Sequence, residues 1–151
     1  MNDADATVVR VTRRFDASPE RVFDAWLDPA TAGQWLFATP TGEMQRVEID
    51  ARVGGRYAIV ERREEGDAEH FGEYLEIDRP RRLVFTLAVE PDAQSGDHIT
   101  VEITPVGDGC ELTLTHVMAP EYAEYAGRTE SGWNDVLASL ARQLASANDT
   151  H

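Results

Sequence analysis

The chain has 151 residues, the length of one typical domain, and its 42% hydrophobic content argues against a disordered protein. Its 28 acidic residues outnumber its 14 basic residues, all of them arginine, so the formal net charge is −14 at pH 7. This charge disfavours nucleic acid and anionic membrane surfaces as partners, because both are negatively charged. The acidic, lysine-free composition is typical of a GC-rich bacterial or a salt-adapted source.

The sequence has few features that would indicate a targeting signal, a membrane segment or a disulfide. Residues 1–9 lack the basic region and apolar run of a signal peptide, and no apolar run approaches the roughly 20 residues of a membrane helix. We therefore expect a cytoplasmic protein with no membrane insertion. Cys110 is the only cysteine, so neither an intramolecular disulfide nor a CxxC site can form.

Residues 7–15 alternate apolar and polar side chains, which predicts a half-buried strand. Ser18 and Pro19 then form a helix start, with Ser18 as the cap and Pro19 at the first helical position. This helix should end near Asp28, because the residue before a proline avoids helical conformation. A second short helix over residues 29–34 delivers Trp35 to the interior.

Alternation continues through the middle of the chain and predicts six further strands. They cover residues 44–50, 56–62, 69–77, 82–89, 99–103 and 112–118, with turns at 52–55, 64–67, 78–80 and 105–109. Consecutive hairpins indicate an antiparallel sheet. A helical segment that begins at Pro120 leads toward the last element, with a kink or break expected at Gly127 or Gly132.

Residues 129–147 carry one apolar stripe, with side chains spaced at i, i+3, i+4, i+7 and i+11: Trp133, Val136, Leu137, Leu140 and Leu144. A helix this apolar on one side must lie on another element. We predict an α+β helix-grip fold, in which a curved seven-stranded antiparallel sheet wraps around this long C-terminal helix. The fold forms a single domain over residues 1–151 with an ordered core at about 7–147.

Several segments resemble a known family in their order along the chain. They are Ser18-Pro19-Glu20-Arg21-Val22-Phe23-Asp24-Ala25-Trp26, Val53-Gly54-Gly55-Arg56-Tyr57, Gly72-Glu73-Tyr74-Leu75-Glu76-Ile77, Pro80-Arg81-Arg82-Leu83-Val84-Phe85, Leu112-Thr113-Leu114-Thr115-His116 and Gly132-Trp133. Together they resemble the START-like (SRPBCC) superfamily, and within it the subgroup similar to the activator of heat-shock protein 90 ATPase. The resemblance implies the helix-grip fold and brings no invariant catalytic residue. Its relatives include lipid carriers, polyketide cyclases and co-chaperone domains.

Strand parity places a set of side chains around one space between the sheet and the last helix. Apolar walls with a few polar groups are what a small-molecule pocket needs. The candidate ligand-binding residues are Trp35, Tyr57, Ile59, Glu61, Phe85, Leu87, Val101, Leu114, His116, Met118, Trp133 and Leu137. The alternative is that the apolar members simply fill the core.

Glu61 and His116 are the only candidate catalytic residues. Glu61 stands where the resembled subgroup often has an apolar residue, and an inward carboxylate paired with His116 or an arginine could act as a general base. The alternatives are that Glu61 lies at the wet end of its strand near Arg62 and Arg63, and that His116 is a core histidine packed on the last helix. Arginines 79, 81 and 82 are most simply a solvated face.

The chain contains no phosphate-binding glycine loop, no HExxH and no GxSxG motif, and its four histidines are not spaced as metal ligands. We therefore expect no cofactor and no metal, and Cys110 has no activating base beside it in sequence. Three functions remain open. They are a carrier of a small hydrophobic or amphipathic molecule, a cyclase- or hydratase-like enzyme, and a co-chaperone-like module. A homodimer also remains open.

Overall fold

The computed structural model describes residues 7–36, 42–64, 66–88, 97–118, 124 and 126–149, with side chains up to Leu144 in the last segment. The element order is the predicted one, with three helices and seven strands. Its elements are β1 (Thr7–Phe15), α1 (Pro19–Leu27), α2 (Pro29–Trp35), β2 (Glu43–Ile49), β3 (Arg56–Arg63), β4 (Gly66–Asp78), β5 (Arg82–Leu87), β6 (Asp97–Val106), β7 (Gly109–Met118) and α3 (Ala126–Asp149).

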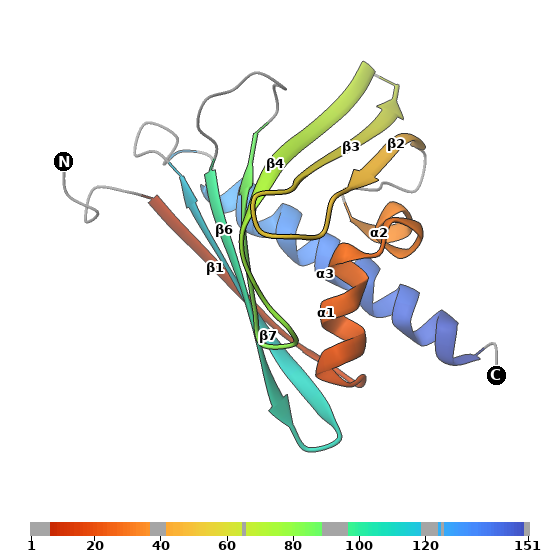
Figure 1. The fold of residues 1–151 in the computed structure, drawn as a ribbon, viewed down its shortest axis with the longest axis vertical. Coiled ribbons are helices and arrows are strands. Elements are labelled where there is room, and N and C mark those ends of the chain that lie inside the picture. Colours follow the sequence, from red (N-terminus) through yellow and green to blue (C-terminus); the bar gives the residue numbers. More distant parts are fainter. Residues whose placement is uncertain are drawn as a thin grey trace.

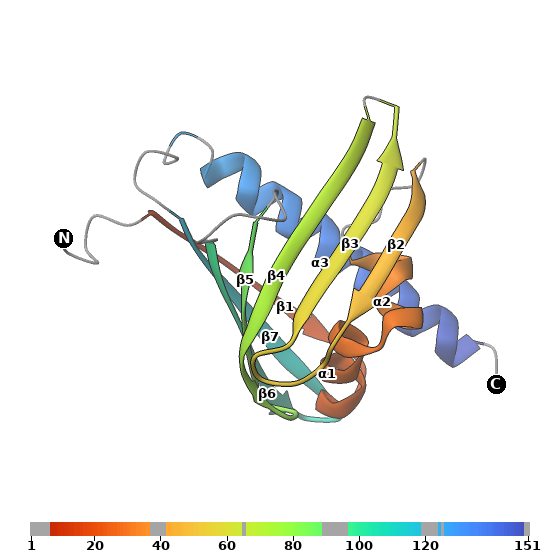
Figure 2. The ribbon, with the colours of Figure 1, turned by 45° about the horizontal axis from the view of Figure 1, so that its top comes forward.

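The strands form one antiparallel sheet in the order β1-β7-β6-β5-β4-β3-β2. Every neighbouring pair except β1 and β7 is joined by consecutive chain, as expected for successive hairpins. The sheet curves around α3, which crosses its concave side, while α2 lies beside β2 and α1 lies between α2 and β6 (Figures 1 and 2). This arrangement confirms the predicted helix-grip fold.

The local signals at the helix starts act as the sequence predicts. The Ser18 side chain accepts a hydrogen bond of 3.2 Å from the Arg21 backbone N–H, and Pro19 occupies the first turn of α1. Asp28 ends α1 with its backbone N–H bonded to the Asp24 carbonyl, and it precedes Pro29 at the start of α2. The two helices therefore meet at a sharp corner, which turns Trp26 and Trp35 into the interior.

The apolar stripe of α3 is buried against the sheet. Trp133 is 4% exposed, Leu137 and Leu140 are fully buried, and Leu144 is 8% exposed. The helix runs continuously from Ala126 through Gly127 and Gly132, so the break expected there is absent. No atom lies within 4 Å of a methyl group built on either glycine, so neither residue serves a close approach. Of the predicted helical segment beginning at Pro120, residues 120–123 and 125 lie outside the described residues, and Ala126 and Gly127 belong to α3.

Two turns are shorter than the sequence predicts, and in the turn expected over residues 64–67 Gly66 and Asp67 already belong to β4. Residues 105–109 were expected to form the turn between the last two strands, but β6 continues through Pro105 to Val106 and β7 begins at Gly109. The loop is therefore only Gly107 and Asp108, and Gly107 has a φ of 58°, as a tight hairpin turn requires. Pro105 is tolerated because it lies at the end of its strand.

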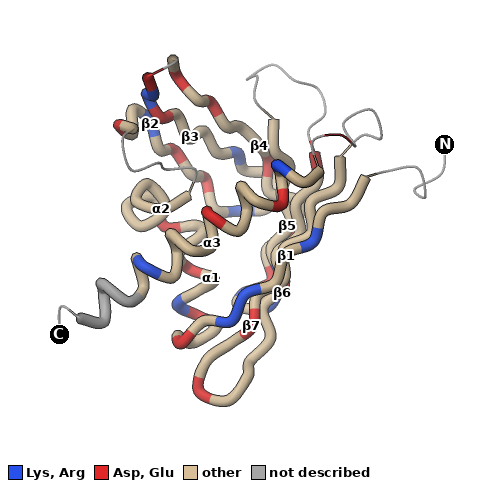
Figure 3. The backbone as a smooth tube through the Cα atoms, turned by 180° about the vertical axis from the view of Figure 1, so that it is seen from behind, with Lys and Arg blue, Asp and Glu red and all other residues tan. Residues whose placement is uncertain are grey.

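Most charged side chains lie on the outside of this fold, and Glu61 is a buried exception. Figure 3 shows arginine positions spread over β1, α1, α3 and the strands rather than gathered on one element. In the described part of the chain, none of the helices is both long and apolar enough to span a membrane.

Candidate functional site

Most of the residues named from strand parity are buried between the sheet and the helices. Trp35, Tyr57, Ile59, Phe85, Val101, Leu114, Trp133 and Leu137 belong to one buried apolar cluster, and Leu87 packs against it. Met118, Glu61 and His116 are also buried, at 5%, 1% and 4% exposure. These side chains pack with residues of the three helices and form part of the core of the domain.

His116 is held by two partners. The indole N–H of Trp133 donates to its Nδ1 at 2.8 Å, and its Nε2 lies 2.8 Å from Oδ2 of Asp97. Because Nδ1 must carry a lone pair to accept from Trp133, the proton of the neutral ring belongs on Nε2, which donates to Asp97. His116 therefore ties β7 to α3 and to the start of β6, as the core-histidine alternative describes.

Glu61 is paired with an arginine rather than with His116. Its Oε1 lies 2.6 Å from Nε of Arg63, and the Arg63 side chain is 29% exposed. Strand β3 lies four places from β7 in the sheet. With about 4.8 Å between strands, Glu61 and His116 are separated by roughly 19 Å along the sheet. An acid–base partner for Glu61 must therefore come from a nearer residue.

That nearer residue is His70, which the sequence reading did not single out. His70 is opposite Ile59 in the β3–β4 register, and directly opposed residues share a face, so the imidazole lies on the inward side with Glu61 and Arg63. Burial lowers the pKa of His70 from 6.5 to about 4, and the charge of Arg63 acts in the same direction. The ring is neutral at pH 7.

We call Glu61, Arg63 and His70 the polar trio. Glu61 and Arg63 continue the line of Tyr57 and Ile59 along the inward face of β3, and His70 lies on the neighbouring strand β4, opposite Ile59. The backbone at Gly42 covers the buried acid of the trio, because a methyl group there would lie 2.6 and 2.7 Å from the two Glu61 oxygens. A carboxylate this buried is stable only with a partner, and Arg63 supplies it.

The tyrosines on the same face are neutral. Burial raises the pKa values of both Tyr57 and Tyr74 above the ordinary value, so neither ionises near neutrality. The Tyr57 hydroxyl donates to the Thr86 carbonyl at 2.7 Å. Gly72 lets the ring approach, because a methyl group at this position would overlap the Thr86 carbonyl and the Tyr57 ring. Tyr57 therefore serves packing between β3 and β5.

A cluster of aromatic rings joins the helices to the sheet. Trp26 of α1 lies 4.8 Å from Trp35 of α2, 6.1 Å from Phe85 of β5 and 6.4 Å from Trp133 of α3, measured between ring centroids. Trp26 is not among the candidate residues named from strand parity. The signal was present in the sequence, since Trp26 follows Val22 by about one helical turn and large aromatic side chains bury much apolar area.

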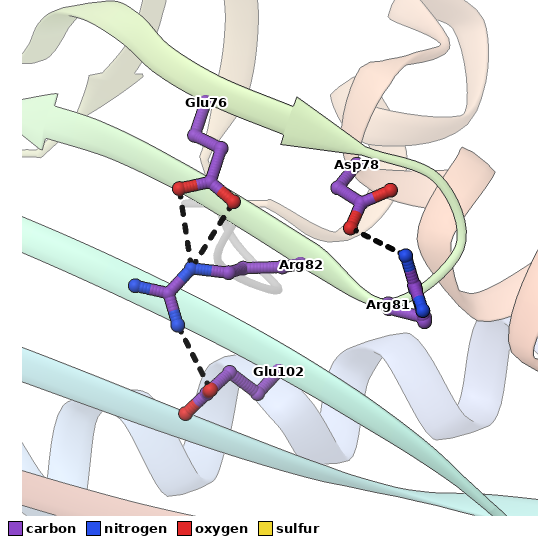
Figure 4. A network of polar contacts seen from close by, with 5 residues as sticks. All are labelled: Glu76, Asp78, Arg81, Arg82 and Glu102. Atoms are coloured by element: carbon purple, nitrogen blue, oxygen red, sulfur yellow. Dashed lines mark hydrogen bonds and ion pairs between the residues drawn. The ribbon is translucent and has the colours of Figure 1, made fainter.

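The arginines of the β4–β5 turn are each paired with a carboxylate at the surface. Arg82 contacts Glu76 and Glu102 across neighbouring strands, and Arg81 contacts Asp78 (Figure 4). Arg79 makes two hydrogen bonds to Asp24, at 2.7 and 2.8 Å. These side chains are about half exposed, so each pair adds little stability. This is the solvated face expected from the sequence.

Neither metal nor nucleophile chemistry finds support in the parts of the chain that the structure describes. Among those residues, no three His, Cys, Asp or Glu side chains gather as ligands for an ion. The Cys110 thiol is buried, and burial raises its pKa, so it stays protonated near neutrality.

Comparison with known proteins identifies the family. A family model described as "Activator of Hsp90 ATPase homolog 1-like protein" matches residues 16–145. No curated protein matches the chain. The family and the fold support a ligand-binding or a co-chaperone-like role.

Solved structures show the same fold. They include a crystal structure of a protein from Nitrosomonas europaea, at 18% identity and a TM-score of 0.82, covering 98% of this chain and 99% of that one. A crystal structure of a Chromobacterium violaceum protein has 28% identity and a TM-score of 0.78, covering 90% and 96%. The solution structure of an AHSA1-like protein from Aeromonas hydrophila has 21% identity and a TM-score of 0.79, covering 94% of each chain. The chain belongs to the Activator of Hsp90 ATPase homolog 1-like family, within the START-like (SRPBCC) superfamily.

Proposed function

We propose that the protein binds a small hydrophobic or amphipathic molecule between the concave face of the sheet and α3. The observation that carries this proposal is the polar trio at the border of the apolar interior. Glu61, 1% exposed, and the partly buried His70 lie on the same inward face as Tyr57 and Ile59. Ligand sites are built in this way, with apolar and aromatic walls and a few convergent polar groups.

The electrostatics of the trio favour an uncharged polar group on the ligand. The Glu61 carboxylate and the Arg63 guanidinium balance each other, and the His70 ring is neutral above a pKa of about 4. A charged ligand group would meet one like charge and would lose its hydration on entry. A hydroxyl or carbonyl group loses far less and still finds donors and acceptors.

Native mass spectrometry of freshly purified protein, compared with the denatured mass, tests the proposal. We expect extra mass that leaves on denaturation, and the same spectrum reports whether the chain is a monomer or a homodimer. His70→Phe, which makes the trio less polar, should lower the retained fraction. Glu69→Gln is the matched control, because it changes the adjacent residue on the opposite, exposed face of β4.

The carrier function would be ruled out by two results together. The protein would carry no extra mass, and no compound in a hydrophobic library would raise its melting temperature. If the native protein, His70→Phe and Glu69→Gln retain the same fraction of bound molecule, the polar trio does not contribute to binding.

A cyclase- or hydratase-like enzyme is the second candidate, and the shared face of Glu61 and His70 favours it. In this alternative Glu61 takes a proton from the bound molecule, and the neutral His70 hydrogen-bonds the reacting group. Glu61→Gln should then abolish turnover while leaving binding intact, and full turnover in that variant would exclude the acid–base role. A co-chaperone function, which the family description raises, is checked by adding the protein to an Hsp90 ATPase assay.

A further inference from the structure

The three tryptophans differ in what their indole N–H groups meet. Trp35 Nε1 donates to the Ala25 carbonyl at 3.1 Å, and Trp133 Nε1 donates to His116 at 2.8 Å. Trp26 Nε1 is buried, and among the residues that the structure describes it has no hydrogen-bond partner. The Trp26 residue is only 2% exposed. The same domain therefore satisfies two buried indoles and leaves the third without an acceptor.

An unsatisfied buried donor is unusual in a native protein, because the group has lost its bonds to water and gained none. The position of this donor makes it informative. Trp26 lies where α1, α2, α3 and the sheet meet, with ring centroids 4.8 to 6.4 Å from Trp35, Phe85 and Trp133. This is the apolar interior in which the proposed ligand binds.

We infer that the Trp26 indole N–H is a ligand-anchoring donor and that the ligand carries a neutral carbonyl oxygen to accept from it. The inference rests on the proposed function and adds the chemistry of its ligand. A carboxylate is disfavoured as the acceptor because a buried anion needs a cation beside it, and the neighbours of Trp26 in the cluster are aromatic rings. A ketone, ester, amide or quinone oxygen meets no such cost.

The aromatic neighbours also define the shape of the ligand. Rings around one donor favour a flat, aromatic or conjugated body, because edge and offset ring contacts add to the burial of apolar area. A ring-face contact from Trp35, which meets Trp26 at 88°, is the competing way to satisfy the N–H, and such contacts are weaker than a bond to oxygen.

A pair of fluorescent probes separates these accounts. One is 6-acetyl-2-dimethylaminonaphthalene, and the other is 2-dimethylaminonaphthalene, which lacks the acetyl carbonyl. Dissociation constants of both are measured by fluorescence titration for the native protein, Trp26→Phe and Phe23→Leu. Phe23→Leu is the matched control, because it changes a buried aromatic side chain of the same helix that has no N–H and is not among the candidate ligand-binding residues.

We expect the native protein to bind the acetyl probe about fivefold tighter than its analogue, as one added hydrogen bond predicts. Trp26→Phe should erase this preference, and Phe23→Leu should keep it. A native protein that binds both probes equally, or a Trp26→Phe variant that keeps the preference, would overturn the inference and leave the proposed function standing. Failure of the native protein to bind either probe would count against the proposed function itself and the inference with it.

A second readout needs no folded Trp26 variant. In the ¹H–¹⁵N spectrum of the native protein, the Trp26 indole signal should move downfield when the acetyl probe is added and not when its analogue is added. Indole signals that respond equally to both probes would show ring contact without a hydrogen bond, and would overturn the inference.

Discussion

Replacing His70 with glutamine tests how the inward face of β3 and β4 is packed. Burial lowers the pKa of His70 from 6.5 to about 4 in the folded protein. In the unfolded chain the imidazole recovers its ordinary pKa near 6.5. Between these two values the unfolded state binds a proton that the folded state does not. Stability therefore falls as the pH drops from about 6.5 to about 4.

The magnitude follows from the two pKa values. The fall from 6.5 to about 4 corresponds to about 3 kcal/mol if it is fully expressed. The ring is partly exposed, so solvent screening reduces the expected loss to about 2 kcal/mol. His70→Gln removes the titrating group and keeps a neutral polar side chain. The variant should therefore lose about 2 kcal/mol less than the native protein between pH 7.5 and pH 4.5.

Urea unfolding followed by circular dichroism, at four pH values in this range, measures the difference. Carboxylates also titrate at the acid end, so each variant is compared with the native curve rather than with a flat line. His98→Gln is the control, because His98 is exposed on β6. Its curve should run parallel to the native one. A His70→Gln curve that is also parallel to the native curve would refute the desolvated position of the ring.

Three further substitutions test the packing. Trp133→Ala should lower the free energy of unfolding by about 3–5 kcal/mol, because the ring is 4% exposed and donates to His116, and an unchanged thermal melt would show that α3 is not gripped. Gly72→Ala should cost about 3 kcal/mol, since the new methyl group overlaps the Thr86 carbonyl and the Tyr57 ring. Gly132→Ala, with open space around it on α3, should instead stabilise the protein by about 0.5–1 kcal/mol in the same melts, and a loss there would contradict the open environment.

Periodicity along the chain predicted much of the fold, because the spacing of apolar residues within each element shows which of its sides is buried. Alternation in β3 correctly placed Tyr57, Ile59 and Glu61 on one inward face. The stripe on α3 fixed which of its residues pack on the sheet. The Ser18-Pro19 start marked α1 to the residue. These features depend on residues within one strand or one turn of helix. They can therefore be predicted without knowing which element packs against them.

The partners of the polar side chains were decided only by the tertiary structure. Strand order separates Glu61 from His116, and register places His70 beside Ile59. His70 was not predicted as an inward residue because the next inward position on β4 is Gly72. Glycine has no side chain, so it interrupts the alternation of apolar and polar residues. The missing acceptor of Trp26 likewise depends on three helices and a strand meeting at one point. Alternation fixes which side of a strand is buried, whereas hydrogen bonds require particular atoms within about 3 Å, and only the packed fold sets such distances.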